Sequence, residues 1–239
     1  MVVLYSFMGD INSLDELADS ELRGALKKIL TPGGIVLDVG ANRGQFALDV
    51  LSVQACKIFC FEPLPDAFRY LQILQDSHPQ INPVQLAVSN VSGEAEFHVT
   101  AGDVGSSLLA PMENQGSQWQ MPIPGGGITV QSTRLDEFIV EQGIGRVELL
   151  KSDAQGFDGR VIESAGEFLN PDSIGAVLVE LNFHKFYQDQ DSFYSIMEKI
   201  CTSGYFLAGI FRHFNRSGWL WWADALFLPD RPPFSTQFE

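Results

Sequence analysis

The amino-acid sequence predicts an α/β fold in which a mostly parallel sheet is covered by helices on both faces. Short apolar runs typical of buried strands alternate with longer stretches of helical periodicity. Polar residues also gather where several of the apolar runs end. Open sheets of this kind bind ligands at the carboxyl ends of their strands, so we expect the functional site at that edge.

The first third of the chain shows the clearest order of elements. Ser13-Leu14-Asp15-Glu16 has the form of a capping box, in which two side chains satisfy free backbone N–H groups, and it opens a helix predicted to reach about Leu30. Thr31-Pro32-Gly33-Gly34 ends this helix. The elements predicted next are a strand at 35–39, a helix at 45–53, a strand at 58–61 and a helix after Pro63.

Further along the chain the pattern weakens. Val84–Val88 is predicted to be a third strand, whereas residues 93–99 and 102–127 are rich in Gly, Ser and Pro and are predicted to be the least ordered part. A short helix is expected after Thr133, followed by strands at 147–153, 176–181, 205–211 and 225–228, with a Trp-rich turn between the last two. We expect one domain over 1–239, with a leading helical segment at 1–32 and a substrate-side loop insertion at 100–128.

Composition narrows the classes of partner. The 30 acidic and 15 basic residues give a formal charge of −15, which repels nucleic acids and anionic lipid surfaces. Cys56, Cys60 and Cys201 are odd in number and lack zinc-ligand spacing, so we expect free thiols and no metal site. The apolar residues 1–8 have no basic leader and are too few to span a bilayer. We therefore expect a cytoplasmic protein without a membrane span.

The glycine loop after the first predicted strand indicates a nucleotide-type cofactor. Dinucleotide sites need a second glycine to seat the pyrophosphate, but Asn42 stands at that position between Gly40 and Gly44. S-adenosylmethionine has no phosphate, and the loop backbone with Asp38 is suited to its amino-acid tail. Glu62 lies 22 positions after Gly40, close to the offset at which an acidic residue accepts hydrogen bonds from ribose hydroxyls.

S-adenosyl-L-methionine is therefore the predicted cofactor. The predicted contacts are Asp38, Gly40, Ala41, Asn42, Gly44, Gln45, Glu62, Pro63 and Asp153. Three alternatives stay open at this point. The loop is also compatible with a plain strand-to-helix turn, with an NAD-dependent oxidoreductase, and with a binding module that keeps the fold without catalysis.

Two blocks of sequence resemble the FkbM family of methyltransferases. The first comprises Val36–Phe46 and Phe61–Phe68, and the second comprises Arg134–Phe138 and Val147–Asp158, with its Lys-x-Asp-x-x-Gly pattern. The resemblance covers about residues 35–181. It implies a Rossmann-like class I methyltransferase fold with a seven-stranded, mostly parallel sheet. It also implies O-methylation of a hydroxyl on a small molecule or glycan, such as a sugar, glycolipid or polyketide product.

The second block departs from the family at two acidic positions. Gln155 replaces a frequent Glu, and Asp158 replaces a later Glu. A hydroxyl acceptor must lose its proton during methyl transfer, so we expect a general base at the end of the fourth or fifth strand. The candidates are Asp153, Asp158, Glu180 and His184, of which we favour Asp153.

Several other residues allow two interpretations. Lys151 lies two positions before Asp153 on the same strand face, so it either takes part in catalysis or forms an ordinary ion pair. His184 suits a base near neutral pH, yet a histidine among aromatic residues is more often packed or on the surface. The tryptophans that could form an acceptor platform or pack in the core are Trp219, Trp221 and Trp222, and strand alternation places Trp222 on the opposite face from the other two.

Overall fold

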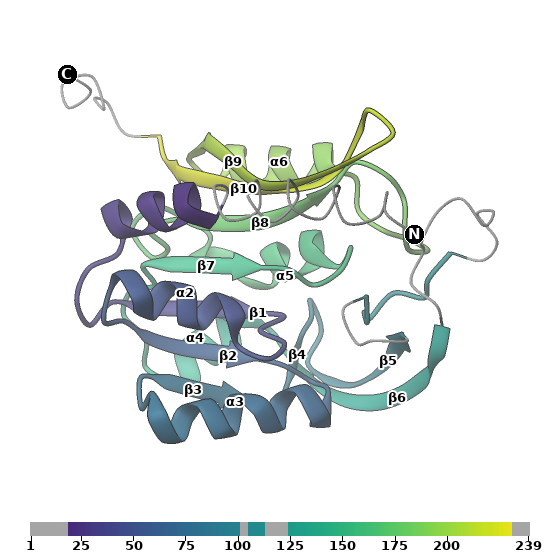
Figure 1. The fold of residues 1–239 in the computed structure, drawn as a ribbon, viewed down its shortest axis with the longest axis horizontal. Coiled ribbons are helices and arrows are strands. Elements are labelled where there is room, and N and C mark those ends of the chain that lie inside the picture. The colour runs from purple at the N-terminus through teal and green to yellow at the C-terminus, as the bar shows by residue number, and fades with distance from the viewer. Residues whose placement is uncertain (1–18, 101–104, 113–123, 231–239) are drawn as a thin grey trace, which may run out of the picture.

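The computed structural model describes residues 19–100, 105–112 and 124–230 (Figure 1). Its main feature is a seven-stranded sheet with the order β3-β2-β1-β7-β8-β10-β9. The pairs from β3 to β8 are parallel, whereas β10 runs antiparallel to both of its neighbours. The strands of this sheet are β1 (Ile35–Val39), β2 (Lys57–Phe61), β3 (Ile81–Val84), β7 (Leu149–Ser152), β8 (Val177–Asn182), β9 (Tyr205–Arg216) and β10 (Trp219–Pro229).

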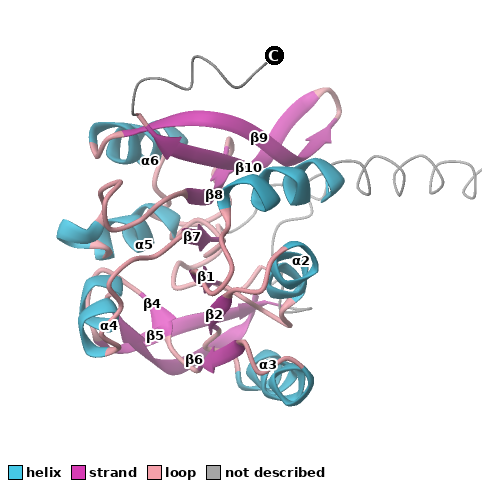
Figure 2. Cartoon of the chain, turned by 90° about the vertical axis from the view of Figure 1, so that its left-hand side faces the viewer, coloured by secondary structure: helices cyan, strands magenta, loops and turns pink. Residues whose placement is uncertain are grey.

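Helices cover both faces of this sheet, as Figure 2 shows. One face carries α4 (Leu135–Glu141), α5 (Asp158–Ser164) and α6 (Phe193–Thr202). The other face carries a helix over residues 19–29, α2 (Gln45–Val53) and α3 (Pro65–Ser77). The predicted fold class is therefore confirmed. A short 3-10 helix, Gly166–Phe168, follows α5.

Alternation along the central strands produces the two apolar layers. In β1, Leu37 and Val39 pack in the cluster that includes Phe138 of α4. Val36, which points to the opposite face, packs with Leu26 of the helix over 19–29. Because successive side chains of a strand point to opposite sides, a strand covered on both faces reads as a continuous apolar run. The strand at 35–39 was predicted from such an apolar run.

The helix over 19–29 agrees with the predicted leading helix, although the capping box at 13–16 lies outside the described residues. The helix packs through Leu22 and Leu26, and Leu30 follows directly after it; all three are buried. In the described part of the chain, the helices are too short or too polar to cross a membrane.

A second sheet corrects the prediction for the middle of the chain. Its strands are β4 (Ala87–Val88), β5 (Gly93–Thr100) and β6 (Pro124–Thr133), in the order β4-β6-β5. Strand β3 ends at Val84, so the predicted third strand at Val84–Val88 is wrong: its two ends belong to different sheets. Residues 93–99 were expected to be poorly ordered, yet β5 pairs with β6 along its whole length. The small sheet packs on the start of α3 through Phe97 and Val130.

The two C-terminal strands are longer than predicted. Strands β9 and β10 form a hairpin whose tip is Ser217-Gly218, both with positive φ (53° and 80°), as a two-residue hairpin turn requires. The Trp-rich segment is therefore part of β10 and is not a turn. A register shift between Leu220 and Trp222 interrupts the alternation. Trp221 is buried, whereas Trp219, which directly follows the tip of the hairpin, is 67% exposed, although the sequence placed them on one face.

Candidate active site

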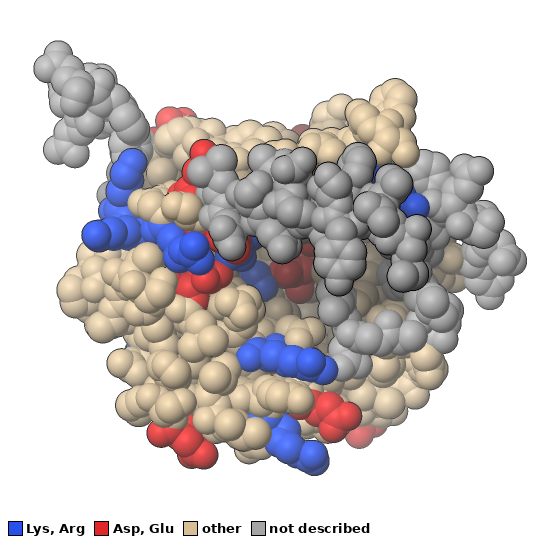
Figure 3. Space-filling view, viewed as in Figure 1, with Lys and Arg blue, Asp and Glu red and all other residues tan. Residues whose placement is uncertain are grey.

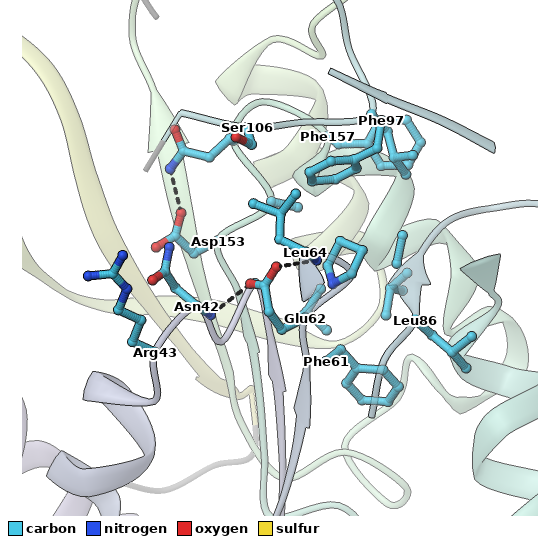
Figure 4. A pocket seen from close by; sticks show the side chains of 18 of the residues that line it. Asn42, Arg43, Phe61, Glu62, Leu64, Leu86, Phe97, Ser106, Asp153 and Phe157 are labelled. Carbon is cyan, nitrogen blue, oxygen red and sulfur yellow. Dashed lines mark hydrogen bonds between the residues drawn. The ribbon is translucent and has the colours of Figure 1, made fainter. Parts of the chain in front are cut away.

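A cavity of about 240 Å³ lies at the carboxyl ends of β1, β2 and β7 (Figure 4). Figure 4 shows Asn42, Arg43 and Asp153 on one side of it and Phe97, Phe157 and Leu86 on the other, with Glu62 between. The cavity thus has a polar end and an apolar end. Its wall comprises Val39, Gly40, Asn42, Arg43, Gln45, Phe61, Glu62, Pro63, Leu64, Leu86, Ala87, Val88, Phe97, Ser106, Leu108, Asp153, Ala154, Gln155 and Phe157.

The glycine loop between β1 and α2 forms the polar end. Gly40 has a φ of +71°, and a Cβ there would lie 2.0 Å from the backbone oxygen of Asp153. No side chain fits at that position, because the approach is to rigid backbone. Gly44 has a φ of +87°, and a Cβ would meet Leu74 of α3 at 2.5 Å. Gly44 therefore allows α2 to pack against α3 and does not contribute to the cavity wall.

Glu62, at the end of β2, anchors the middle of the cavity. Its Oε2 accepts a hydrogen bond from the backbone N–H of Asn42 at 2.9 Å, and its Oε1 accepts one from the N–H of Leu64 at 2.8 Å (Figure 4). Burial raises the pKa of Glu62 to about 7, although these hydrogen bonds act in the opposite direction. Each carboxylate oxygen has a further lone pair, so the side chain can still accept from a ligand hydroxyl.

Lys151 lies beneath the cavity, where it links β1, the glycine loop and the end of β7. Its Nζ lies 3.3 Å from Oδ1 of Asp38 and 3.6 Å from Oδ2 of Asp153, and it donates to the carbonyl of Gly40 at 3.3 Å. Burial alone would lower the pKa of Lys151, but the two carboxylates outweigh it and raise the pKa. The ammonium therefore stays charged. Of the two interpretations of Lys151, the geometry favours the ion pair, because this side chain is not part of the cavity wall.

Asp38 is completely buried beneath the loop and does not reach the cavity. Burial raises its pKa, and the charge of Lys151 opposes that shift. Asp38 thus lies outside the cavity wall, and its direct contact with the cofactor stays a prediction. Its carboxylate holds Lys151, which in turn binds the loop backbone. A buried acid of this kind was not distinguishable in the sequence from one that faces a ligand.

Among the four candidate bases, only Asp153 contributes to the cavity wall. Asp158 is fully buried and accepts from Ser152 Oγ at 2.6 Å and from the N–H of Ala154 at 2.9 Å. Burial raises the pKa of Asp158 to about 6. This side chain holds the loop after β7 in shape.

Glu180 and His184 also lie away from the cavity wall. Glu180 is buried within the sheet, where it accepts from Asn182 Nδ2 at 3.0 Å. His184 is exposed, and its ring packs against Trp221 with centroids 5.2 Å apart. His184 therefore lies outside the cavity wall, and its role as a base stays a prediction.

The predicted cofactor contacts divide into two groups. Those in the cavity wall are Gly40, Asn42, Gln45, Glu62, Pro63 and Asp153, whose contact with a cofactor stays a prediction. Those outside the wall are Asp38, Ala41 and Gly44. Ala41 packs in the apolar layer below α2 and is buried.

Sequence reasoning missed the apolar end of the cavity. Phe97 and Leu108 come from the part of the chain that was predicted to be least ordered, and no local spacing marks them. Residues 105–112 are tied across this end, because Ser107 pairs with His98 of β5 and its Oγ donates to the carbonyl of Ala154 at 3.3 Å. Phe61 and Leu64 flank Glu62, and their place at a strand end was a usable signal.

The strand order, the antiparallel β10 and a cavity at the ends of β1 and β2 together define a class I methyltransferase fold. The structure of Aeropyrum pernix fibrillarin in complex with natively bound S-adenosyl-L-methionine is similar, with a TM-score of 0.50 and 14% identity over 89% of this chain and 74% of that one. The chain belongs to the Methyltransferase FkbM domain family, whose model matches residues 38–207. The family predicted from the sequence is confirmed.

Two curated relatives share part of this sequence. The 2-O-methyltransferase NoeI of Sinorhizobium fredii is 30% identical over 146 residues, which cover 58% of this chain and 60% of the relative. The 31-O-demethyl-FK506 methyltransferase FkbM of Streptomyces tacrolimicus is 31% identical over 156 residues, which cover 56% of this chain and 60% of the relative. The matched parts thus span about 60% of the length of both relatives.

Proposed function

We propose that this protein transfers a methyl group from S-adenosylmethionine to a hydroxyl of a small molecule or glycan. The observation that carries the proposal is the two-ended cavity, in which Glu62 separates a polar end with Asp153 from an apolar end with Phe97 and Phe157. A nucleoside attached to a charged amino-acid tail has the same division of chemistry. Membership of a methyltransferase family gives independent support.

The residues of the cavity fit this cofactor. Leu64, Leu86 and Phe97 would enclose the adenine, because an apolar wall is suited to a flat ring. The carboxylate of Glu62 would accept from the ribose hydroxyls, and the backbone around Gly40, where a Cβ has no room, would lie against the amino-acid tail. When bound, S-adenosylmethionine supplies a methyl group activated by a sulfonium.

Asp153 would act as the general base. As the oxygen of the acceptor bonds to the methyl carbon and the carbon–sulfur bond breaks, the hydroxyl proton has to leave. The carboxylate of Asp153 lies at the polar end and its side chain is 34% exposed, so an acceptor can reach it. Lys151 beside it keeps the local charge balanced.

The acceptor class is inferred from chemistry and from the relatives. Both relatives are named as O-methyltransferases, which supports a hydroxyl acceptor. A sugar, glycolipid or polyketide-type product fits that description. A nucleic acid fits poorly with a charge of −15, and on the face shown in Figure 3 basic side chains stand among acidic ones. The free cysteines, of which Cys201 is exposed, support a reducing compartment such as the cytoplasm.

We also propose that the chain acts as one methyltransferase domain and that residues 100–128 help to select the acceptor. The described residues 105–112 cross the apolar end of the cavity and contribute Ser106 and Leu108 to it. Residues 124–128 belong to β6, so a loop over the whole range is not what the structure has. Loops at this edge of a sheet usually determine substrate choice.

Calorimetry with S-adenosylhomocysteine tests the cofactor. We expect micromolar binding, and at least a tenfold weaker affinity for Glu62→Ala because the ribose loses its acceptor (about 1.4 kcal/mol or more). Glu198→Ala is the matched control, since Glu198 is exposed on α6. Absence of binding to folded protein would refute the proposal.

Incubation with methyl-labelled S-adenosylmethionine and cell extract, followed by mass analysis of labelled products, tests the transfer. We expect label on an oxygen of a small molecule or glycan. Cofactor binding without labelled product from any extract would favour a binding module that keeps the fold.

A further inference from the structure

The turn after β7 holds Gln155 in a conformation that connects two parts of the site. Gln155 has a φ of +52°, in the left-handed region that few residues with side chains adopt. Its Nε2 donates to Oδ1 of Asp153 at 2.8 Å, and its Oε1 accepts from the hydroxyl of Tyr187 at 3.1 Å. The amide of Gln155 thus links the carboxylate in the cavity wall to a residue 32 positions later.

Tyr187 is built into this arrangement. It is only 2% exposed, and its hydroxyl also donates to the carbonyl of Gly105 at 2.9 Å. Its ring lies so close to Gly156 that a Cβ at that position would meet Cδ2 at 2.7 Å. The glycine therefore lets the aromatic ring approach, and the ring supports the turn that carries Gln155.

The direction of these hydrogen bonds is determined by chemistry. A carboxylate oxygen can only accept, so the NH₂ of Gln155 faces Oδ1 of Asp153 and the amide oxygen of Gln155 faces Tyr187. The single hydroxyl proton of Tyr187 is shared between this amide oxygen and the carbonyl of Gly105. Oδ1 of Asp153 is then the acceptor of a fixed donor. Oδ2 lies 3.6 Å from Lys151 Nζ, which is longer than a hydrogen bond.

We infer that Gln155 is a positioning residue for methyl transfer, which orients the side chain of Asp153 and leaves Oδ2 to take the proton of the acceptor hydroxyl. Tyr187 acts one step further away by fixing the orientation of the amide. The inference rests on the proposed function. It also gives a physical role to Gln155, which departs from the family pattern: an amide donates to Asp153, where a carboxylate would repel it.

Asp153 lies among several carboxylates, so the protonation of this region should respond strongly to a negative charge added at position 155. The cations on this side of the cavity are Lys151 on β7, 3.6 Å from Oδ2 of Asp153, and Arg43 in the cavity wall. The carboxylates that act on the same region belong to Asp38 on β1, Asp158 on α5, Glu180 on β8 and Asp224 on β10. Gln155→Glu would add the closest negative charge of all, because it replaces the donor 2.8 Å from Oδ1. Two carboxyl groups at that separation must share a proton.

The test compares Gln155→Glu with Gln155→Ala. We expect the acid limb of the rate–pH profile of Gln155→Glu to move to higher pH by about one unit or more. Gln155→Ala should lower kcat by about tenfold without moving that limb, because it removes orientation and adds no charge. Gln142→Glu, at the exposed end of α4, is the control for added charge. If both Gln155 variants lose rate equally and the limb stays in place, the residue serves packing alone and the inference is wrong.

A second measurement does not depend on an acceptor. An infrared difference spectrum of Gln155→Glu against wild type at about pH 5, where ordinary Asp and Glu side chains are mostly ionised, should show an additional protonated carboxyl group, and the Gln142→Glu spectrum should not. Two ionised carboxylates at 153 and 155 at that pH would overturn the inference even if no acceptor is found. Failure of methyl transfer with the additional band present would instead refute the proposed function alone.

Discussion

The main sheet contains two pairs of ionisable residues whose members lie directly opposite each other on neighbouring strands. The two pairs differ in whether their members carry opposite or like charges. Asp38 on β1 is in register with Lys151 on β7. Asp224 on β10 is in register with Glu180 on β8. Asp38, Lys151 and Glu180 are buried, so none is stabilised by bulk water. The first pair combines opposite charges, while the second combines two acids.

The difference shows how one sheet handles buried charge in two ways. Lys151 stays charged because the carboxylates of Asp38 and Asp153 more than offset its burial. The acidic pair contains no cation, and the charges of Lys151 and Arg212, which act to lower the pKa of Asp224, do not offset its burial. Burial raises the pKa of Asp224 to about 7, and burial together with neighbouring carboxylates raises the pKa of Glu180 well above its usual range. The pair of Asp38 and Lys151 is therefore an ion pair, through which Lys151 binds the loop at Gly40. The pair of Asp224 and Glu180 is instead protonated where it is buried.

Removal of Lys151 should have the largest effect on stability. We expect Lys151→Met to lower the free energy of unfolding by about 3–5 kcal/mol at pH 7, because it leaves the buried carboxylate of Asp38 without a counter-ion. Urea denaturation measures this change. The control is the double variant Asp38→Asn/Lys151→Met, which removes both charges and should recover part of the loss. A loss below about 1 kcal/mol in the single variant would show that the ion pair contributes little.

The two pairs also show what sequence reasoning can and cannot reach. Pairing of Lys151 with Asp153 was one of the two interpretations that the sequence allowed, since both lie on one strand face two positions apart. Its closer carboxylate partner is Asp38, which is 3.3 Å away against 3.6 Å. That contact depends on the register of β1 against β7, which are neighbours in the sheet but lie far apart in the sequence. Asp224 was not considered at all, because the apolar run that predicted the last strand began at Ala225.

The acidic pair should give an effect of intermediate size and opposite sign. We expect Asp224→Asn and Glu180→Gln each to raise the free energy of unfolding by about 1–2 kcal/mol at pH 8, since a neutral amide needs no proton. The unfolded chain ionises these acids near pH 4, whereas burial keeps them protonated to about pH 7 for Asp224 and higher for Glu180. Wild-type stability should therefore fall as pH rises from about 4 to 7.

Thermal or urea unfolding across this pH range measures the gain. It should vanish below about pH 4, where both acids are protonated in the folded and unfolded states alike. A gain that does not change with pH would assign the effect to packing and would contradict the protonation of these two acids in the folded state.

The fold itself was predictable to different degrees in its two sheets. The strands β1, β2, β7 and β8 are covered on both faces, so an apolar run marks each of them. Strand β3 contains Asn82 and Pro83, which are unfavourable in most strands. It tolerates them because it lies at the edge of the sheet. Strands β5 and β6 depend on pairing across 24 residues or more, with glycines at 126 and 127, and no local pattern reports such pairing.

A third cluster at the edge of the sheet should give the smallest effect. Arg212 is the extra residue of a bulge in β9, between the pairs Asp224–Phe211 and Ala223–His213, and its φ of +32° turns the side chain toward Asp49 and Asp19. Asp49 also binds Arg23 at 3.2 Å. Its charge therefore keeps a partner when Arg212 is lost.

We expect Arg212→Gln to lower the free energy of unfolding by about 1 kcal/mol, and by less in 1 M salt, because Asp19 and Arg23 are partly exposed and ions screen them. Urea denaturation at low and high salt measures both values, with Lys151→Met as the reference for a buried pair. A loss as large as that of Lys151→Met, and independent of salt, would place Arg212 with the buried pair. The size of the loss would then depend only on whether a pair combines opposite or like charges. Arg23, the cation that Asp49 retains, would not reduce it.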